Sequence, residues 1–345
     1  MTSDAPTRYL NTVYVVDYDT KLHLRKGSLT ASTPNGQHRI PMNAVEAVVM
    51  FNGQITTNAI AECVQRGIRV AVLKRSGHVR FTAGGPTTGN VHLRIAQVDA
   101  SRDEATARRA ASIIVAAKIT NSAALARRWS TDAQTTEAAS KAIEATEKLT
   151  AVLNGIDPRM DRDSLRGMEG DAARAYFSAM ASHLRGSGWT FSGRNRRPPR
   201  DPVNALLSFC YGMLSTEYKG ACDAVGLDPQ IGLLHQALRP GRPSMALDLM
   251  EEARALTDRF VVSVLKRKQL SPGCFETALG DACYLTDDGR RTVLDLWEAD
   301  KNREFMHPLL MRKVARWALP TIQATMMARW LRGDLPDYPP FLSRR

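Results

Sequence analysis

The hydrophobic pattern changes abruptly near residue 90, and this change constrains the fold more than any other feature of the chain. Before it, short runs of β-branched or alternating apolar residues predict strands at 12–18, 22–29, 44–51 and 68–73. Between the last two runs, apolar residues at three- and four-residue spacing predict a helix at 56–66. After the change, long segments with the same spacing predict amphipathic helices. We therefore expect two units of different architecture.

The boundary is marked by TAGGPTTGN at 82–90, which is rich in Gly, Pro and Thr. A chain of 345 residues is long enough for two domains. We predict an α+β protein with a small β-rich domain at 1–85, a linker at 86–92 and a larger, nearly all-α domain at 93–345. Helices in the larger domain are expected at 132–153, 169–182, 202–225, 244–265, 287–302 and 305–332.

Basic residues outnumber acidic residues by 47 to 35, and the resulting charge of +12 favours a polyanionic partner such as nucleic acid. The alternative is a basic surface that is only solvated. Aromatic residues make up only 6% of the chain, which argues against a base-stacking platform. The five cysteines form no C-x-x-C pair, and no apolar run is long enough to span a membrane. We expect a cytoplasmic protein without a disulfide framework or a zinc site.

Glu169 lies in GMEGDAARAYF, between Gly167 and Gly170 and ahead of residues with helical spacing. Its side chain is expected near the start of a helix, beside small residues that leave room for a ligand. The alternative is a carboxylate that only complements the positive end of the helix dipole.

Further candidates are His235 in IGLLHQ and three acids in SMALDLMEEAR. His235 is either a metal ligand through one ring nitrogen or an interior histidine at the end of a helix. Offsets of three and four are expected to bring Asp248, Glu251 and Glu252 to one side of a helix. Asp248 has apolar neighbours, and a buried acid needs a cation or an arginine as partner. Glu252 fits a solvated face better.

Carboxylates with one imidazole form a mostly oxygen donor set, which suits Mg²⁺ or Mn²⁺ better than Zn²⁺. Such an ion beside a basic surface indicates phosphodiester chemistry, because it neutralises charge on the phosphate and stabilises the displaced oxygen. Spacing does not show whether Glu169 and His235 meet in space.

Two basic segments are candidates for contact with phosphates. The first, at 185–200, contains no acid and is expected to form an exposed loop, and the second follows His235. The alternative is a solvated loop without a nucleic-acid partner. The candidate residues are Arg185, Arg194, Arg196, Arg197, Arg200, Arg239 and Arg242.

Several motifs, in order along nearly the whole chain, resemble the CRISPR-associated endonuclease and integrase of spacer acquisition, the first-numbered Cas protein. In the β-rich half they are LNTVYV, VEAVVMFNGQITTNAI and GGPTTGNVHLRIAQ, and in the helical half GMEGDAARAYF, IGLLHQ and RPSMALDLMEEAR. The last motif is similar to the type I-C branch. One departure is that Ala253, Arg254 and Ala255 stand where members often carry Phe-Arg-Pro.

The resemblance implies a metal site made of Glu169, His235 and Asp248, with Glu251 in a supporting role and Mg²⁺ or Mn²⁺ as the ion. It implies a β-rich N-terminal domain used for dimerisation and a helical catalytic domain. The implied reaction is insertion of captured double-stranded DNA fragments as new spacers at CRISPR repeats, by attack of their 3′-hydroxyl ends. The implied partners are a second copy of the chain and the small second Cas protein, in the prokaryotic cytoplasm.

Two other functions stay open at this point. A non-catalytic DNA-binding architectural protein would use the basic surface and leave the acids solvated. A stand-alone metal nuclease for branched DNA would use the same site without a partner or a repeat.

Overall fold

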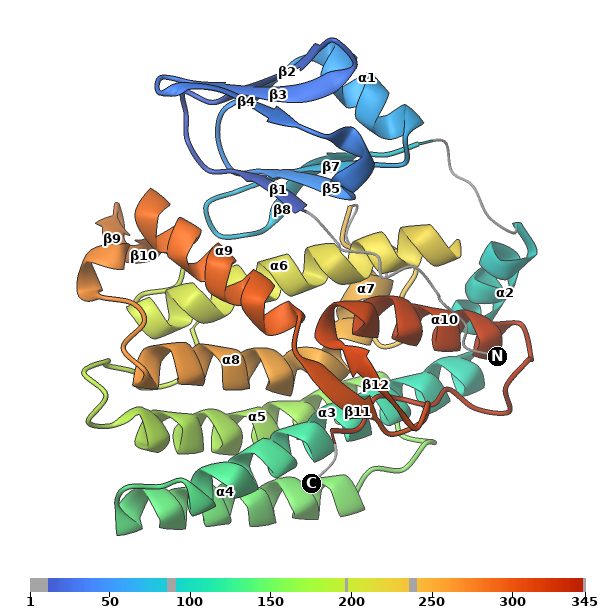
Figure 1. Cartoon of the computed structure of the whole chain (residues 1–345). Helices are drawn as coiled ribbons and strands as arrows, with labels where there is room; N and C mark the ends of the chain where they lie inside the picture. The colour runs from blue at the N-terminus through green and yellow to red at the C-terminus, as the bar shows by residue number, and fades with distance from the viewer. Residues whose placement is uncertain (1–11, 86–90, 196–197, 236–240, 344–345) are drawn as a thin grey trace. The chain divides into compact units, whose positions relative to one another are not determined.

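The computed structural model describes residues 12–85, 91–195, 198–235 and 241–343 (Figure 1). The chain divides into two compact units, Met1–Thr88 and Gly89–Arg345. This division falls inside the predicted linker at 86–92, although the first helix of the second unit already begins at Val91.

The described part of the N-terminal unit contains two four-stranded sheets and one α-helix. In one sheet, of order β1-β5-β7-β8, the first three strands are parallel and β8 is antiparallel; the other has the order β4-β3-β2-β6. The elements are β1 (Thr12–Val15), β2 (Lys21–Arg25), β3 (Ser28–Thr33), β4 (Gly36–Ile40), β5 (Ala47–Met50), β6 (Gln54–Ile55), α1 (Thr57–Gln65), β7 (Arg69–Leu73) and β8 (Val79–Ala83).

The core of this unit is made by apolar side chains of both sheets and of α1. Leu22, Leu29, Val48, Val70 and Cys63 are completely buried in it. Burial of such side chains is the main term that stabilises a small β-rich unit.

The strand predicted at 22–29 is wrong, because the chain forms a hairpin there. Lys26 and Gly27 have φ values of 49° and 70°, so the backbone reverses between β2 and β3. Glycine takes this left-handed conformation without steric cost, and it was the turn signal inside an otherwise strand-like run.

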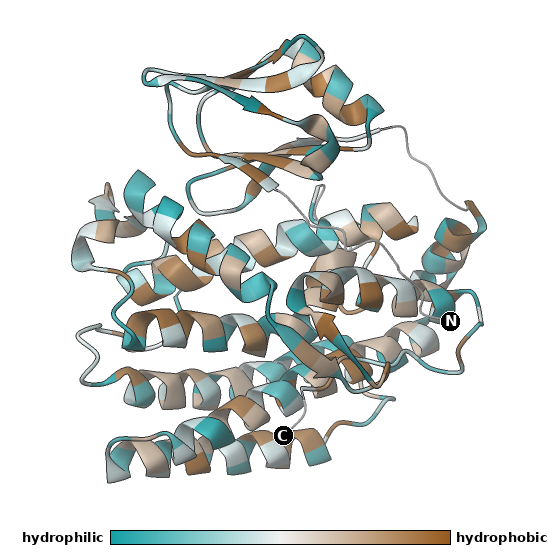
Figure 2. Cartoon of the chain, viewed as in Figure 1, coloured by the Kyte–Doolittle hydropathy of each residue, from teal (hydrophilic) through white to brown (hydrophobic). Residues whose placement is uncertain are grey.

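The second unit is mainly helical, as predicted, and its described residues also form two short β-hairpins. In Figure 2, hydrophilic and hydrophobic residues alternate along α9, which places one face of this helix against the core. The elements are α2 (Val91–Arg102), α3 (Glu104–Thr131), α4 (Thr136–Asn154), α5 (Arg162–Leu184), α6 (Pro202–Val225), α7 (Ser244–Met250), α8 (Arg254–Lys266), β9 (Phe275–Ala278), β10 (Ala282–Leu285), α9 (Asp287–Lys301), β11 (Glu304–His307), β12 (Arg312–Ala315) and α10 (Leu319–Leu331).

Helix α6 matches its prediction because its ends carry strong local signals. The Asp201 carboxylate accepts the Asn204 N–H at 2.8 Å, and Pro202 opens the helix. Gly226, with φ of 92°, ends it in the left-handed conformation.

The continuous helix predicted at 305–332 is wrong. Strands β11 and β12 form an antiparallel hairpin there, and α10 begins only at Leu319. Pro308 and Pro320 explain the difference, because proline has no N–H for the helix and is tolerated only in its first turn. Among the residues that the structure describes, no helix has the length and apolar character needed to cross a membrane.

His183 gives the helical unit a pH-dependent stability. Its ring stacks on Trp129 with centroids 5.6 Å apart, and Lys266 Nζ lies 3.1 Å from Nε2. Burial and the nearby charge of Lys266 lower the pKa of His183 from 6.5 to about 4. The charge of Asp132 has the opposite, smaller effect. The fold therefore favours the neutral ring, and this stabilisation is complete above pH 6.5 and is lost as the pH falls toward 4.

We expect the thermal midpoint of a His183→Gln variant to rise relative to that of the wild type as the pH falls from 7 to 5, because glutamine cannot take up the proton. The measurement is a set of melting curves of both proteins across this pH range. Equal pH dependence of the two proteins would show that His183 does not titrate as described.

Candidate functional site

Lys118, Glu169 and Glu251 meet around one ammonium group. Lys118 Nζ contacts a carboxylate oxygen of Glu169 and lies 2.7 Å from Glu251 Oε2. Arg254 Nε lies 3.2 Å from the same Glu251 oxygen. The residues come from α3, α5, the 3₁₀ turn Glu251–Ala253 and the start of α8, so only the tertiary fold brings them together.

Glu169 lies in the middle of α5, and its predicted place near a helix start is wrong. The helix begins at Arg162, two turns earlier, where the Asp161 carboxylate accepts the Ser164 N–H at 2.9 Å. Because the dipole acts within the first turn, Glu169 does not serve as a helix-dipole partner. A methyl group at Gly167 or Gly170 would meet nothing within 4 Å, so the expected free space beside Glu169 exists.

Glu251 is ionised although it is only 2% exposed. Burial works to raise the pKa of its carboxyl, but the charges of Arg254 and Lys118 outweigh burial and hold the pKa at about 2. Glu251 offers a charged oxygen donor at neutral pH.

Asp248 is completely buried and holds the segment that carries His235. Its two oxygens accept the backbone N–H groups of Leu233, Leu234 and His235 at 2.6, 2.9 and 3.0 Å. Its Oδ1 also lies 2.7 Å from His235 Nδ1. Since a carboxylate accepts hydrogen bonds, Nδ1 carries the proton and the lone pair of His235 lies on Nε2.

His235 lies in a non-helical bend, not at the end of a helix. Its side chain is 19% exposed. The bend packs so closely that a methyl group at Gly232 would lie 2.9 Å from Asp248 Oδ2 and 2.5 Å from the His235 carbonyl oxygen. Only glycine permits this approach of backbone to carboxylate.

The three acids predicted on one side of a helix have separate partners. Asp248 lies in α7, whereas Glu251 and Glu252 lie in the 3₁₀ turn that follows it. Glu252 is 2% exposed instead of solvated, and accepts hydrogen bonds from Tyr338 Oη at 2.8 Å and Phe341 N at 2.6 Å. Burial, opposed by these hydrogen bonds, raises its pKa to about 7. Glu252 therefore anchors the C-terminal segment.

Sequence reasoning missed Lys118 and a buried cluster around Asp258. Asp258 accepts hydrogen bonds from Tyr176 and Tyr211, and the Arg254 guanidinium lies 4.8 Å from the centroid of the Tyr211 ring. The one sequence feature that could have indicated Lys118 is its position in an otherwise apolar run of α3. The contact between α3 and α5 that gives it a role is not encoded in this local pattern.

Across the part of the chain that the structure describes, no three His, Cys, Asp or Glu side chains are arranged to hold one metal ion. Two carboxylates, Glu169 and Glu251, both contact the ammonium group of Lys118. Carboxylate oxygens are hard donors, which suit Mg²⁺ or Mn²⁺. A cavity of about 30 Å³ lies beside Lys118, Glu169 and Arg254, which is room for a small ligand of the size of water or an ion. Glu169 and Glu251 therefore supply two oxygen donors that fit a divalent cation.

The predicted phosphate-contacting arginines differ in their surroundings. Arg194 is held inside the unit by Asn204 Oδ1 at 2.7 Å and Ser208 Oγ at 3.0 Å. Arg185 is exposed and paired with Glu137. Arg200 is exposed and Arg242 is half-buried, while Arg196, Arg197 and Arg239 lie outside the described residues.

The segment at 185–200 is not the wholly exposed loop that we predicted. Phe191 is 8% exposed, and Trp189 packs edge-on against Phe275 with centroids 5.4 Å apart. The Asn195 N–H donates to Asn204 Oδ1 at 3.0 Å, which ties the segment to α6.

A family model described as "CRISPR associated protein Cas1" matches residues 13–299. The chain is 40% identical to "CRISPR-associated endonuclease Cas1 2" of Rhodospirillum rubrum, over 97% of the chain and 98% of that protein. It is 36% identical to "CRISPR-associated endonuclease Cas1 1" of Moorella thermoacetica, over 97% and 99%. The fold is similar to a Cas1 protein from Thermotoga maritima, with a TM-score of 0.79, 20% identity and coverage of 97% and 100%.

These matches define an enzyme class, the CRISPR-associated endonucleases. The chain belongs to the family of the CRISPR-associated protein Cas1. The fold is also similar to a solved structure titled "Casposase bound to integration product", with a TM-score of 0.81, 19% identity and coverage of 95% and 92%. Assignment to the type I-C branch stays a prediction.

Proposed function

We propose that this enzyme is a metal-dependent DNA endonuclease and integrase that joins the 3′-hydroxyl ends of captured DNA fragments to CRISPR repeats by transesterification. The observation that carries the proposal is the pair of carboxylates, Glu169 and Glu251, held together by the ammonium group of Lys118. Membership of the Cas1 family supports the class of reaction.

We propose Glu169 and Glu251, which Lys118 holds together, as ligands of Mg²⁺ or Mn²⁺, with His235 joining them when the ion binds. Asp248, implied as a ligand by the sequence resemblance, has both oxygens engaged by N–H donors. We propose that Asp248 holds His235 with Nδ1 protonated, so that the lone pair of Nε2 is available to the metal ion. Such carboxylate–histidine pairs orient the ligand histidine at many metal sites.

When bound, the ion supplies Lewis-acid stabilisation of the phosphate oxygens. Side chains of the protein balance the negative charges of the two carboxylates. Lys118 offsets the repulsion between the two carboxylates, and Arg254 neutralises the buried Glu251. The nucleophile is the 3′-hydroxyl of the DNA, so the proposal needs no nucleophilic side chain.

The proposed partners follow from the relatives. A solved structure titled "Cas6-RT-Cas1--Cas2 complex" has a TM-score of 0.82 and 20% identity to this chain, covering 98% of this chain and 37% of that one. We propose double-stranded DNA, a second copy of the chain and the small second Cas protein as partners, acting in the prokaryotic cytoplasm where the repeats lie. The predicted arginine contacts at Arg185, Arg200 and Arg242 belong to the same proposal.

The test is a strand-joining assay with Mn²⁺, a fragment bearing 3′-hydroxyl ends and a repeat duplex. Glu169→Ala is expected to lower the joining rate by about 100- to 1,000-fold, because a lost ligand removes several kcal/mol of transition-state stabilisation. Asp171→Ala is the matched control, since Asp171 lies on the same helix, is exposed and pairs only with Arg174 among the described residues.

The joining rate of the control is expected to stay within about twofold of the wild type, in line with the small energy of exposed ion pairs. Equal joining by Glu169→Ala, or joining in the presence of EDTA, would contradict the proposed site. Hydrolysis without any joining would instead support a stand-alone nuclease.

A further inference from the structure

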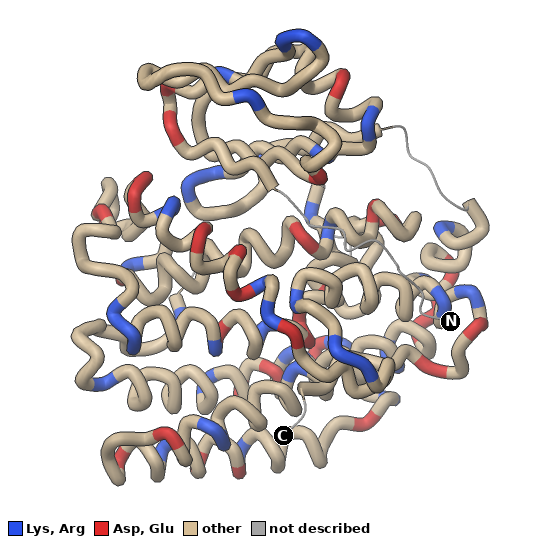
Figure 3. The backbone as a smooth tube through the Cα atoms, in the orientation of Figure 1, with Lys and Arg blue, Asp and Glu red and all other residues tan. Residues whose placement is uncertain are grey.

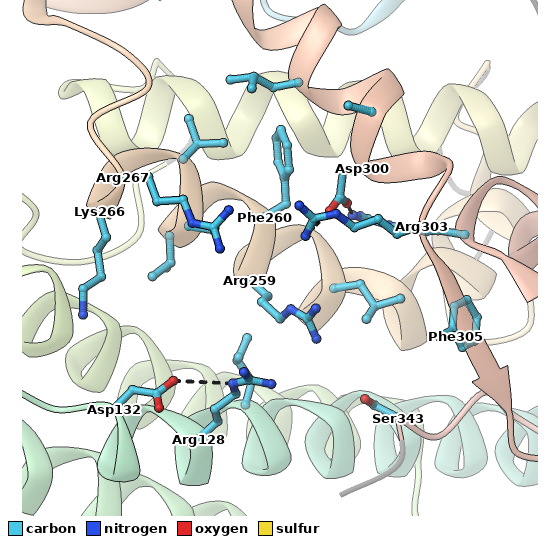
Figure 4. Close-up of a pocket in the computed structure, with 18 of the residues that line it drawn as sticks. Arg128, Asp132, Arg259, Phe260, Lys266, Arg267, Asp300, Arg303, Phe305 and Ser343 are labelled. Atoms are coloured by element: carbon cyan, nitrogen blue, oxygen red, sulfur yellow. Dashed lines mark hydrogen bonds and ion pairs between the residues drawn. The ribbon is translucent and has the colours of Figure 1, made fainter.

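A second charged feature of the helical unit is a cavity of about 650 Å³ between α3, α8 and the turn from α9 to β11. Figure 4 shows guanidinium groups from these separate elements around one hollow, among them Arg128, Arg259, Arg267 and Arg303. None of the residues that line this cavity belongs to the cluster of Lys118, Glu169, Glu251 and Arg254 described above.

The cavity carries an excess of positive charge. Six basic side chains line it against three acidic ones; the basic residues are Arg128, Arg259, Lys266, Arg267, Arg303 and Arg316, and the acidic residues are Asp132, Asp300 and Glu304. Elsewhere in the unit, acidic and basic residues are interspersed along the chain (Figure 3). The ratio of six basic to three acidic residues also exceeds the ratio of 47 to 35 in the whole chain.

The acids in the cavity are largely engaged. Asp300 pairs with Arg316 and, at 3.6 Å, with Arg303. Among the described residues, Arg259 and Arg267 form no ion pair, and both side chains are exposed. Two guanidinium groups are thus available to an anion.

The cationic side chains stand close enough to repel one another. Arg259 is partly covered by its neighbours, and this partial burial, together with the charges of Arg128 and Arg303, lowers the pKa of its guanidinium. Bringing like charges together costs free energy of folding, and this cost is removed when an anion binds between them. The arrangement is that of a binding site prepared for negative charge.

The basic surface is larger than the area that a single phosphate group would cover. A neighbouring hollow of about 420 Å³ shares Arg128 and Arg259 with the cavity and adds Arg127 and Asn121. A row of cations matches the repeating charge of a polynucleotide better than a single small anion. A flexible single strand enters such a hollow, whereas a stiff duplex needs an open surface.

We propose that this cavity binds successive phosphate groups of single-stranded DNA, at a place separate from the Glu169–Glu251 site. The inference rests on the proposed action on DNA, and adds a site that holds a strand during that action. The arginines contribute position and affinity, because contacts with phosphate carry no base sequence.

The experiment measures binding of a fluorescein-labelled oligothymidine by anisotropy, with EDTA present, over a range of salt concentrations. Arg259→Gln combined with Arg267→Gln is expected to weaken binding about 10-fold and to reduce the slope of log Kd against log salt by about 1.4, since each contact with a single strand contributes roughly 0.7. Arg259→Lys combined with Arg267→Lys is expected to keep most of this slope.

The matched control is Lys148→Gln combined with Arg102→Gln, two exposed cations of the same unit that line neither hollow. Wild-type affinity and slope in the Arg259/Arg267 glutamine variant would overturn the proposal, as would competition by polyglutamate that exceeds competition by unlabelled oligothymidine. The assay contains no divalent ion and reads binding alone, so a failed joining assay would leave its result standing. Melting curves of all variants check that each one folds.

Discussion

Glu251→Gln is expected to lower Mn²⁺-dependent DNA cleavage by about 1,000-fold or more. The substitution keeps the shape of a buried side chain that contacts Lys118 at 2.7 Å and Arg254 at 3.2 Å, but removes its charge. A loss of about 4 kcal/mol of transition-state stabilisation corresponds to this factor, and a lost metal ligand is of that order. The cleavage rate at saturating DNA is the first measurement.

Measuring Mn²⁺ affinity distinguishes the residues that bind the metal from the residues that only support them. Mn²⁺ affinity, measured by calorimetry, is expected to fall most in Glu251→Gln and Glu169→Gln. Asp248→Asn is expected to reduce Mn²⁺ affinity by only about 10- to 100-fold, the usual effect of replacing a residue that hydrogen-bonds to a metal-binding histidine. Glu251→Asp restores the charge and is expected to recover part of the affinity. If Asp248→Asn abolished Mn²⁺ binding while Glu251→Gln left it intact, the ligand set would be the one that the sequence resemblance implied.

Asp248→Asn is expected to lower the free energy of unfolding by about 3 to 5 kcal/mol, the usual effect of removing one charge from a buried, hydrogen-bonded group. The carboxylate accepts three backbone N–H groups, from Leu233, Leu234 and His235, and an asparagine would turn an NH₂ group toward one or more of these donors. Urea unfolding followed by circular dichroism measures the change.

Asp295→Asn is the control for this loss of stability, because Asp295 is exposed on α9 and has no ion pair among the described residues. Its unfolding free energy is expected to stay within about 0.5 kcal/mol of the wild type. A loss below about 1 kcal/mol in Asp248→Asn would show that the bend around His235 is held by other contacts.

The parts of the fold that were predictable are those with local signals. Helix α6 follows from Asp201, Pro202 and Gly226, which act within a few residues of its ends. The failures at 22–29 and 305–332 also have local causes, a glycine turn and two prolines, which apolar spacing alone does not weigh. The change from strands to helices near residue 90 correctly predicted the two architectures.

The candidate site was predictable only as a set of residue types. The sequence pointed to Glu169, His235, Asp248 and Glu251, but the directions of their side chains depend on the packing of helices far apart in the chain. The same applies to Lys118, since a lysine among apolar residues gives no sign of the carboxylates that another helix brings to it.

By itself, the sequence determined the two-unit architecture, the excess of basic charge and the acids and histidine available for chemistry, because composition and periodicity act over neighbouring residues. The tertiary structure alone decided that Asp248 holds the His235 bend, that Glu251 and Glu169 share a cation, and that Arg259 and Arg267 face an open cavity. Hydrogen bonds and charge pairs depend on distances of a few ångströms, and between remote segments only the packed core sets these distances.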